Sequence, residues 1–442
     1  MSIAHSEIGM ITKPCSQDVH YPDSSTLDKV KKILSQLPPL VTHYEIENLK
    51  QQLAEAAQAK RFLLQGGDCA ETFAECSSEK ITNQLRILLQ MSVILIHGLK
   101  KPVIRVGRIA GQYAKPRSQL TETQHDKTLP SYRGDIINDK KFNDKARIPD
   151  PYRMLTAYQH SAQTLNYLRA LTNGGFADIT HPELWNLDFA KNSTMAAEYQ
   201  KIVSHIQSSL KFIEAISNEP DTLRRVDFFT SHEALLLPYE GSFTRQHENR
   251  KYYNLSCHLP WIGMRTAQLD HAHVDFFSKI ANPIAVKVGP AATPDWLKQL
   301  IKILNPHNEP GRLTLITRFG VNKVKELLPK LIKAANSTGI GVLWSCDPMH
   351  GNTKTTAEGI KTRHFDDILQ ELHQTYQIHL QCNSHLGGVH FELTGENVTE
   401  CTGGARGLKD ADLKNAYKSL VDPRLNYEQA LEMAMLLANT TP

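Results

Sequence analysis

The chain has no long hydrophobic run and no surplus of charge of one sign. Its longest apolar stretch, residues 85–99, is interrupted by Arg86, Gln90 and His97, so we expect no membrane span. A formal net charge of +4 over 442 residues leaves no electrostatic footprint for nucleic acid. Residues 1–7 lack a charged segment followed by an apolar one, so we expect no signal peptide.

The cysteines also lack a pattern. There are 7, an odd number without framework-like spacing, in a chain far too long to need disulfide staples. We therefore expect reduced thiols and a cytoplasmic location.

Short apolar runs are what the chain does have, and charged or metal-capable residues follow several of them. The β-branched and aromatic content of these runs is typical of buried parallel strands. The expected strands lie within residues 62–69, 103–108, 226–232, 255–262, 284–290, 313–320, 342–350 and 388–394. The expected helices cover about 25–36, 44–60, 78–99, 151–171 and 194–216.

This alternation predicts an α/β protein with one (β/α)8 TIM barrel. Residues 1–60 form an N-terminal tail and helical extension, and residues 61–442 form the catalytic barrel. A helical insertion, 109–225, follows the second strand, and its first part, 109–150, reads as a long functional loop.

Four residues at or after strand ends are candidate metal ligands. They are Cys69, His350, Glu392 and Asp422. A thiolate, an imidazole and two carboxylates suit a borderline divalent ion, with Mn²⁺ or Co²⁺ favoured and Zn²⁺ or Fe²⁺ as alternatives. Taken singly, such a cysteine is more often a small buried residue, and such a histidine or aspartate is more often a turn residue, than a metal ligand. Only their convergence on one barrel rim would make a site.

A second set is cationic and also falls at strand ends or in the loops after them. It comprises Arg108, Lys115, Arg117, Arg265, Lys287, Arg318 and Lys361. Strand interiors disfavour unpaired charge, so Lys287 must meet an anionic ligand or a carboxylate of the protein. Phosphate and carboxylate groups of a small substrate account for so many cations on one rim.

Five segments carry a family resemblance. They are Gln65–Glu71, Val106–Ser118, Ser231–Leu235, Asp347–Thr353 and Glu392–Cys401. In their order along the chain and in their residues, these segments resemble motifs of the type II (plant-like) 3-deoxy-D-arabino-heptulosonate 7-phosphate (DAHP) synthases. The resemblance extends from about residue 26 to 437. The resemblance implies a metal-dependent barrel enzyme that condenses phosphoenolpyruvate with D-erythrose 4-phosphate, releasing phosphate. That reaction is the first step of the shikimate pathway to chorismate and the aromatic amino acids.

The resemblance also assigns roles. It implies metal binding by the four candidate ligands, and phosphoenolpyruvate binding by Arg108, Lys287 and Arg318. It places further phosphoenolpyruvate contacts at the backbone of Met264 and Arg265, and Met264 replaces a Glu of the family pattern. The segment Lys115–Ser118, which includes Arg117, resembles the erythrose 4-phosphate grip, and Lys361 is a further substrate-binding candidate. Lys115, Arg108 and Lys287 are the candidate catalytic residues, and either Lys115 or a metal-bound water is the acid.

Partners follow from the same reasoning. We expect a homo-oligomer, a dimer or a tetramer, because extra helices on a barrel provide subunit contacts. An aromatic amino acid is a candidate effector. One rival is a non-catalytic barrel that senses a sugar phosphate, and another is a synthase that joins phosphoenolpyruvate to a different aldehyde.

Overall fold

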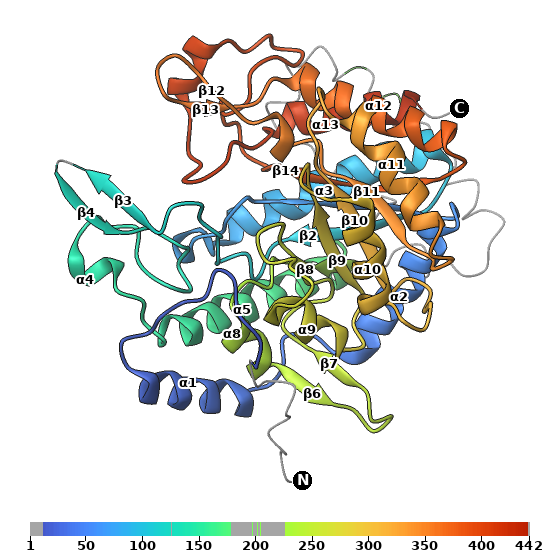
Figure 1. The fold of residues 1–442 in the computed structure, drawn as a ribbon. Helices are drawn as coiled ribbons and strands as arrows, with labels where there is room; N and C mark the ends of the chain where they lie inside the picture. The colour runs from blue at the N-terminus through green and yellow to red at the C-terminus, as the bar shows by residue number, and fades with distance from the viewer. Residues whose placement is uncertain are drawn as a thin grey trace.

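A parallel sheet of eight strands lies at the centre of the computed structural model, which describes residues 12–124, 126–177, 197, 201, 204 and 226–440 (Figure 1). Every pair of neighbouring strands is parallel. The strands are β1 (Phe62–Gly67), β2 (Val103–Arg108), β5 (Phe228–Thr230), β8 (Trp261–Ile262), β9 (Ile284–Val288), β10 (Leu313–Thr317), β11 (Leu343–Cys346) and β14 (Leu386–Glu392).

The two edges of this sheet meet. The strand order is β5-β2-β1-β14-β11-β10-β9-β8, and a parallel bridge joins Glu233, just after β5, to Trp261 in β8. The predicted (β/α)8 barrel is confirmed. Because all eight strands run the same way, their carboxyl ends share one rim, where barrel enzymes place their chemistry.

Helices follow the strands and cover the barrel (Figure 1). They are α3 (Ser78–Leu99), α8 (Leu237–Ser242), α9 (Ala272–Ser278), α10 (Pro294–Leu304), α11 (Val324–Asn336), α12 (Phe365–Gln381) and α13 (Tyr427–Thr440). Local sequence explains their starts. In α10, the Thr293 side chain accepts the backbone N–H of Trp296, and Pro294 occupies the first turn, where its missing N–H costs nothing.

The N-terminal segment forms two helices close to the expected bounds, α1 (Ser24–Gln36) and α2 (His43–Ala57). Thr42 and Glu45 form a capping box at the start of α2. Leu49 and Leu53 of α2 join a buried cluster with side chains from the barrel strands. Burial of this apolar face, rather than helix propensity, holds α2 against the barrel.

The segment after β2 contains more regular structure than the expected loop. An antiparallel hairpin, β3 (Thr121–Gln124) and β4 (Lys127–Pro130), precedes α4 (Asp144–Arg147) and α5 (Arg153–Asn173). The strands of the hairpin are mostly exposed, so they carry no buried apolar pattern for the sequence to reveal. The expected helix at 194–216 lies largely outside the described residues.

The fourth barrel strand is shorter than predicted. Only Trp261–Ile262 pairs with β9, whereas the N–H groups of His258 and Leu259 donate to the Thr230 carbonyl. The preceding chain is taken up by another hairpin, β6 (Thr244–Gln246) and β7 (Tyr252–Asn254). A third small hairpin, β12 (Lys354–Thr355) and β13 (Lys361–Thr362), stands above the rim. Among the described residues, none of the helices combines the length and apolar character needed to cross a bilayer.

Candidate active site

The four candidate metal ligands come from three strand ends and one loop on the same rim. Cys69 follows β1, His350 begins a short 3-10 helix after β11, Glu392 ends β14, and Asp422 lies in the loop before α13. Cys69, Glu392 and Asp422 each offer a ligand atom, and these atoms lie within 4.8 Å of one another. Nε2 of His350 lies 3.0 Å from Oε1 of Glu392. The convergence that the sequence left open is therefore present in the structure.

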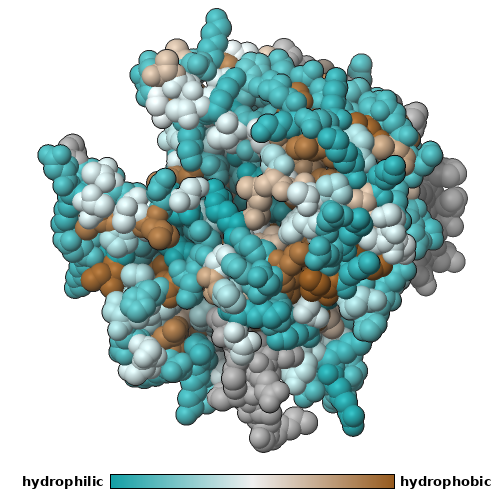
Figure 2. All heavy atoms as spheres, viewed as in Figure 1, coloured by the Kyte–Doolittle hydropathy of each residue, from teal (hydrophilic) through white to brown (hydrophobic). Residues whose placement is uncertain are grey.

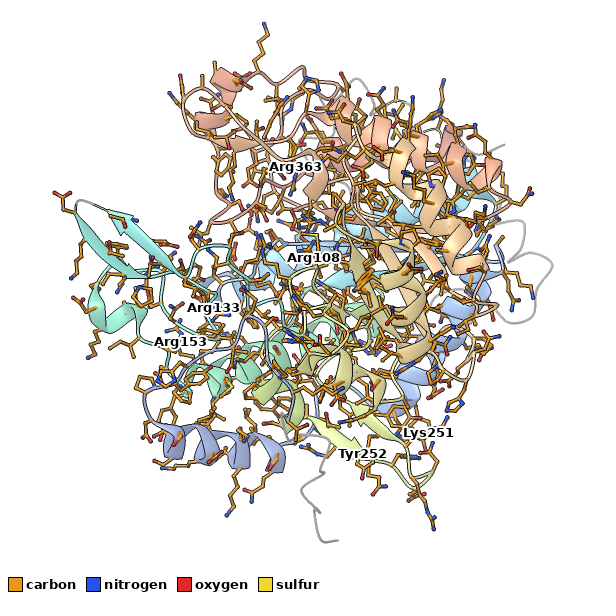
Figure 3. The ribbon with its side chains drawn as sticks, in the orientation of Figure 1. Arg108, Arg133, Arg153, Lys251, Tyr252 and Arg363 are labelled. Carbon is orange, nitrogen blue, oxygen red and sulfur yellow. The ribbon has the colours of Figure 1, made fainter. Side chains whose placement is uncertain are left out.

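Glu392 is the most heavily paired of these residues. It is fully buried, with Nη2 of Arg108 3.1 Å from Oε1 and Nη2 of Arg363 2.8 Å from Oε2. Burial by itself would raise the pKa of Glu392, but His350, Arg363 and Arg108 hold it well below the ordinary value. A carboxylate kept ionised in this way is available as a metal ligand. Figure 3 shows Arg363 above Arg108 in this part of the molecule.

Lys115 points into the same cluster. Its Nζ lies 2.6 Å from Sγ of Cys69, 3.2 Å from Oδ2 of Asp422 and 3.9 Å from Oε1 of Glu392. Burial disfavours the charged form, but Cys69, Asp422 and Glu392 raise the pKa of Lys115 above its ordinary value. The side chains of Cys69, Asp422 and Glu392 thus lie close to the Lys115 ammonium group. Together with the His350 imidazole they have the composition and negative charge that suit a borderline divalent metal.

Two further cations lie over one aromatic ring. The guanidinium carbon of Arg108 is 5.3 Å from the centroid of Trp261, and Nζ of Lys287 is 5.9 Å from it. Lys287 donates to Oδ2 of Asp347 at 2.5 Å. Burial lowers the pKa of Lys287 to about 8, although Asp347 opposes the shift. Both cations are therefore buried. An anionic ligand would be strongly attracted to them there, because charges interact more strongly away from water.

The remaining predicted substrate residues are less uniformly arranged. Nη2 of Arg265 donates to Oγ of Ser118 at 2.7 Å, which joins two members of the set. Arg117 instead pairs with Glu122 of β3 at 2.9 Å. The side chain of Lys361 is 51% exposed and lies 3.5 Å from Asp422.

Arg318 follows β10 and Met264 follows β8, the two strands that flank β9. The N–H of Arg318 donates to the carbonyl of Val288, the last residue of β9. A Cβ on Gly289 would lie 2.1 Å from Sδ of Met264, so the Met264 side chain covers the residue after β9 and would have to move to admit a side chain there. Met264 is 36% exposed, so its side chain borders solvent.

Several buried residues of the site carried no signal in a single sequence. Glu233 packs against Gly263, and burial raises the pKa of its carboxyl group, opposed by Lys115 and Lys287. Asp347 accepts from His350 Nδ1 at 2.7 Å and thereby orients the imidazole. Arg363 follows the short strand β13, so no barrel periodicity marks it. The motifs around Glu233 and Asp347 were noticed only through the family resemblance.

The surface above the rim is hollowed. Figure 2 shows a notch between the lobe that carries the β3–β4 hairpin and the lobe that carries the β12–β13 hairpin. Both lobes grow from loops at the carboxyl ends of strands, after β2 and after β11 respectively. Such loops are the elements that bind substrates in barrel enzymes.

Comparison with known proteins covers nearly the whole chain. Residues 6–438 match the model of the Class-II DAHP synthetase family. A phospho-2-dehydro-3-deoxyheptonate aldolase from Neurospora crassa is 47% identical over 446 residues, covering 97% of this chain and 92% of the relative. Its counterpart from Streptomyces coelicolor is 46% identical over 426 residues, covering 96% and 95%.

A third relative, phospho-2-dehydro-3-deoxyheptonate aldolase AroG from Mycolicibacterium smegmatis, is 45% identical over 434 residues, covering 97% of this chain and 93% of the relative. Among solved structures, phospho-2-dehydro-3-deoxyheptonate aldolase from Francisella tularensis SCHU S4 is 14% identical, covers 96% of this chain and 97% of its own, and has a TM-score of 0.49.

Proposed function

The chain belongs to the class-II DAHP synthetase family, and from this we propose that it condenses phosphoenolpyruvate with D-erythrose 4-phosphate to give DAHP and phosphate. This is the first step of the shikimate pathway. The observation that carries the proposal is the meeting of two residue sets on one rim. Glu392, a candidate metal ligand, directly pairs with Arg108, a candidate phosphoenolpyruvate ligand, at 3.1 Å.

The bond changes define what the site must do. Carbon 3 of phosphoenolpyruvate forms a bond to the aldehyde carbon, water adds at carbon 2, and phosphate leaves by cleavage of its bond to carbon 2. Cys69, His350, Glu392 and Asp422 would hold a divalent metal, which would supply a Lewis acid for the aldehyde oxygen. The new alkoxide takes up one proton. The overall balance is two substrates and one water in, DAHP and one phosphate out.

The chain's own residues bind and orient the substrates. Arg108, Lys287 and Arg318 bind the carboxylate and phosphate of phosphoenolpyruvate, and Trp261, which is buried beneath the first two, excludes water from that side. The Ser118–Arg265 pair binds the phosphate of the aldehyde substrate. Fixing two anions next to each other in this way removes much of the entropic barrier.

Lys115 is our choice for the proton donor. Its Nζ carries a proton beside the metal ligands, and the neighbouring negative charges of Asp422 and Glu392 keep it there in the resting site. We propose Mn²⁺ or Co²⁺ as the working metal, with Zn²⁺ and Fe²⁺ as alternatives, because one soft thiolate accompanies two hard carboxylates.

We also propose a homo-oligomer, a dimer or a tetramer. Large apolar side chains are exposed on the segment after β2, where Leu120 is 68%, Ile148 51% and Tyr152 45% exposed. Figure 2 shows hydrophobic residues gathered on the lobe that carries β3, β4 and α4. Such patches are typical of subunit contacts. Light scattering at micromolar concentration tests this, and a monomer would contradict it. An aromatic amino acid effector and the cytoplasmic location remain predictions.

The decisive experiment is a phosphate-release assay with phosphoenolpyruvate and a panel of aldehydes. The panel contains erythrose 4-phosphate, ribose 5-phosphate, arabinose 5-phosphate and glyceraldehyde 3-phosphate, and mass spectrometry identifies the product. We expect rapid release only with erythrose 4-phosphate. Preference for another aldehyde would favour the rival synthase, and tight binding of sugar phosphate without release would favour the sensor.

A further inference from the structure

Two buried glutamates outside the candidate ligand sets, Glu71 and Glu371, each accept hydrogen bonds from the main chain of one substrate loop. We propose that they are positioning residues, with Glu71 ordering the loop that carries Lys115 and Arg117, and Glu371 ordering the loop that begins at Arg318. The substrate that each loop binds is taken from the proposed function. The ordering of the loops rests on the hydrogen bonds alone.

Glu71 is 8% exposed and lies in the loop after β1. Its Oε1 accepts the N–H groups of Gly111 at 2.9 Å and Gln112 at 2.7 Å, and its Oε2 accepts that of Ala110 at 3.0 Å. The N–H of Glu71 donates in return to the carbonyl of Gln112 at 2.8 Å. Three consecutive N–H groups converge on one carboxyl group, as in a backbone nest, here filled by a side chain of the protein itself.

The backbone of this segment needs such support. Ala110 has φ of 65°, a left-handed conformation that costs energy for any residue with a Cβ. At Gly111 a Cβ would lie 2.4 Å from Nδ1 of His232, so this close approach admits only glycine. No helix or strand spans residues 109–120, and the N–H groups held by Glu71 lie between Arg108 and Lys115 in sequence.

Glu371 does the same for a different loop. It lies on α12 and is 1% exposed, and its Oε1 accepts the N–H groups of Phe319 at 3.0 Å and Gly320 at 2.9 Å. Its Oε2 accepts from Nδ2 of Asn352 at 2.7 Å, and Oδ1 of Asn352 accepts the N–H of Val321 at 2.9 Å. The carboxylate thus ties the loop after β10 to the loop after β11.

Hydrogen bonds from N–H groups to a buried carboxylate are among the stronger ones, and an unpaired buried N–H is costly. Loss of either carboxylate should therefore loosen one loop and leave the other intact. Since the two loops bind different substrates in the proposed reaction, the two variants should affect different Michaelis constants. A general loss of stability would not separate the substrates in this way.

The test uses Glu71→Gln and Glu371→Gln in the metal-loaded enzyme. Glu71→Gln should raise KM for erythrose 4-phosphate about tenfold and change KM for phosphoenolpyruvate less than about twofold, and Glu371→Gln should do the reverse. The control is Glu400→Gln, because Glu400 is a buried carboxylate that accepts N–H groups of Lys418 and Ser419 in the loop before Asp422, although it also pairs with Arg424 at 2.8 Å. It should weaken metal binding, measured by calorimetry, without separating the two Michaelis constants.

Amide hydrogen exchange provides a readout that does not depend on activity. In the unsubstituted protein the amides of residues 110–112 and 319–320 should be protected, and each variant should speed exchange only in its own loop. Glu71→Leu should speed amide exchange in its loop more than Glu71→Gln does, because glutamine keeps one acceptor oxygen. Equal changes in both Michaelis constants, or unprotected amides in the unsubstituted protein, would overturn the proposal. If the unsubstituted protein fails to condense the two substrates, the proposed function is wrong. The exchange measurement still tests whether Glu71 and Glu371 order their loops.

Discussion

The ammonium group of Lys115 lies 2.6 Å from the sulfur of Cys69 and 3.2 Å from Oδ2 of Asp422, which is itself 3.4 Å from that sulfur. Lys115 belongs by sequence to the candidate erythrose 4-phosphate segment, yet its side chain points into the candidate metal cluster. In the proposed reaction the aldehyde oxygen acquires a proton, and Cys69 and Asp422 are among the residues that would hold the metal next to it. A lysine shared between the two sets is placed for that step.

Metal removal gives the first prediction. Exhaustive chelation should abolish phosphate release, and Mn²⁺ or Co²⁺ should restore it. Cys69→Ser should weaken binding of the softer Zn²⁺ and Co²⁺ more than that of Mn²⁺, because it replaces the thiolate with a neutral hydroxyl. Competition titration with a chromogenic chelator measures this, with Cys382→Ser as the control, since Cys382 caps α12. Full activity after chelation would refute the metal mechanism.

Met264 and its neighbour Arg265 give the second prediction. If residue 264 acts through its backbone, its side chain is nearly free to vary, and Met264→Glu should change KM for phosphoenolpyruvate by only about threefold. Arg265→Ala removes the cation that contacts Ser118 and should lower kcat/KM by about 100-fold or more. Steady-state kinetics with both substrates separates the two. Equal damage from both substitutions would rule out the backbone role.

The Arg363–Glu392 pair gives the third prediction. Both side chains are 0% exposed, and their charged atoms lie 2.8 Å apart. Arg363→Met leaves the Oε2 side of Glu392 buried beside a neutral side chain, which should cost about 3–5 kcal/mol of unfolding free energy. The exposed pair Lys330–Glu326 is the control, and Lys330→Met should cost less than about 1 kcal/mol. Urea unfolding measures both, and similar costs would show that Arg363 contributes no buried charge compensation.

His379 gives a prediction about pH. It is 1% exposed on α12, and burial lowers its pKa to about 3 from an ordinary value of 6.5. Between these values the unfolded chain binds a proton that the folded chain does not, so stability is complete above pH 6.5 and falls below it. From pH 7.5 to 5.5 this group should cost about 1.4 kcal/mol.

His379→Gln should remove that part of the pH dependence. The measurement is the free energy of unfolding in urea at pH 7.5 and 5.5 for both proteins. His373→Gln, an exposed position on the same helix, is the control for a changed helix composition. An unchanged difference between the two pH values in His379→Gln would mean that His379 is already accessible to protons in the fold.

Local periodicity was enough to predict the barrel. The apolar run at β2 and the helical patterns of α2 and α3 depend on residues a few positions apart, and the structure has these elements close to the expected bounds. The rule that parallel strands end on one rim made it possible for Cys69 and Glu392 to meet, but the sequence left their convergence open. Their proximity follows because β1 and β14 are neighbours, with Gly67 paired to Glu392.

Contacts between loops could not be predicted in this way. Three such contacts join segments that no regular spacing in the sequence connects. They are the hydrogen bonds of Glu71 to residues 110–112, the ion pair of Arg363 with Glu392, and the contact of Lys115 with Cys69. A single sequence specifies which residues can be buried or charged, since those are properties of each side chain and its neighbours along the chain. Which loop covers which strand end was decided only by the closed barrel, because packing brings together side chains from distant segments. Among the possible arrangements, only those in which each buried charge has a partner of opposite charge are stable.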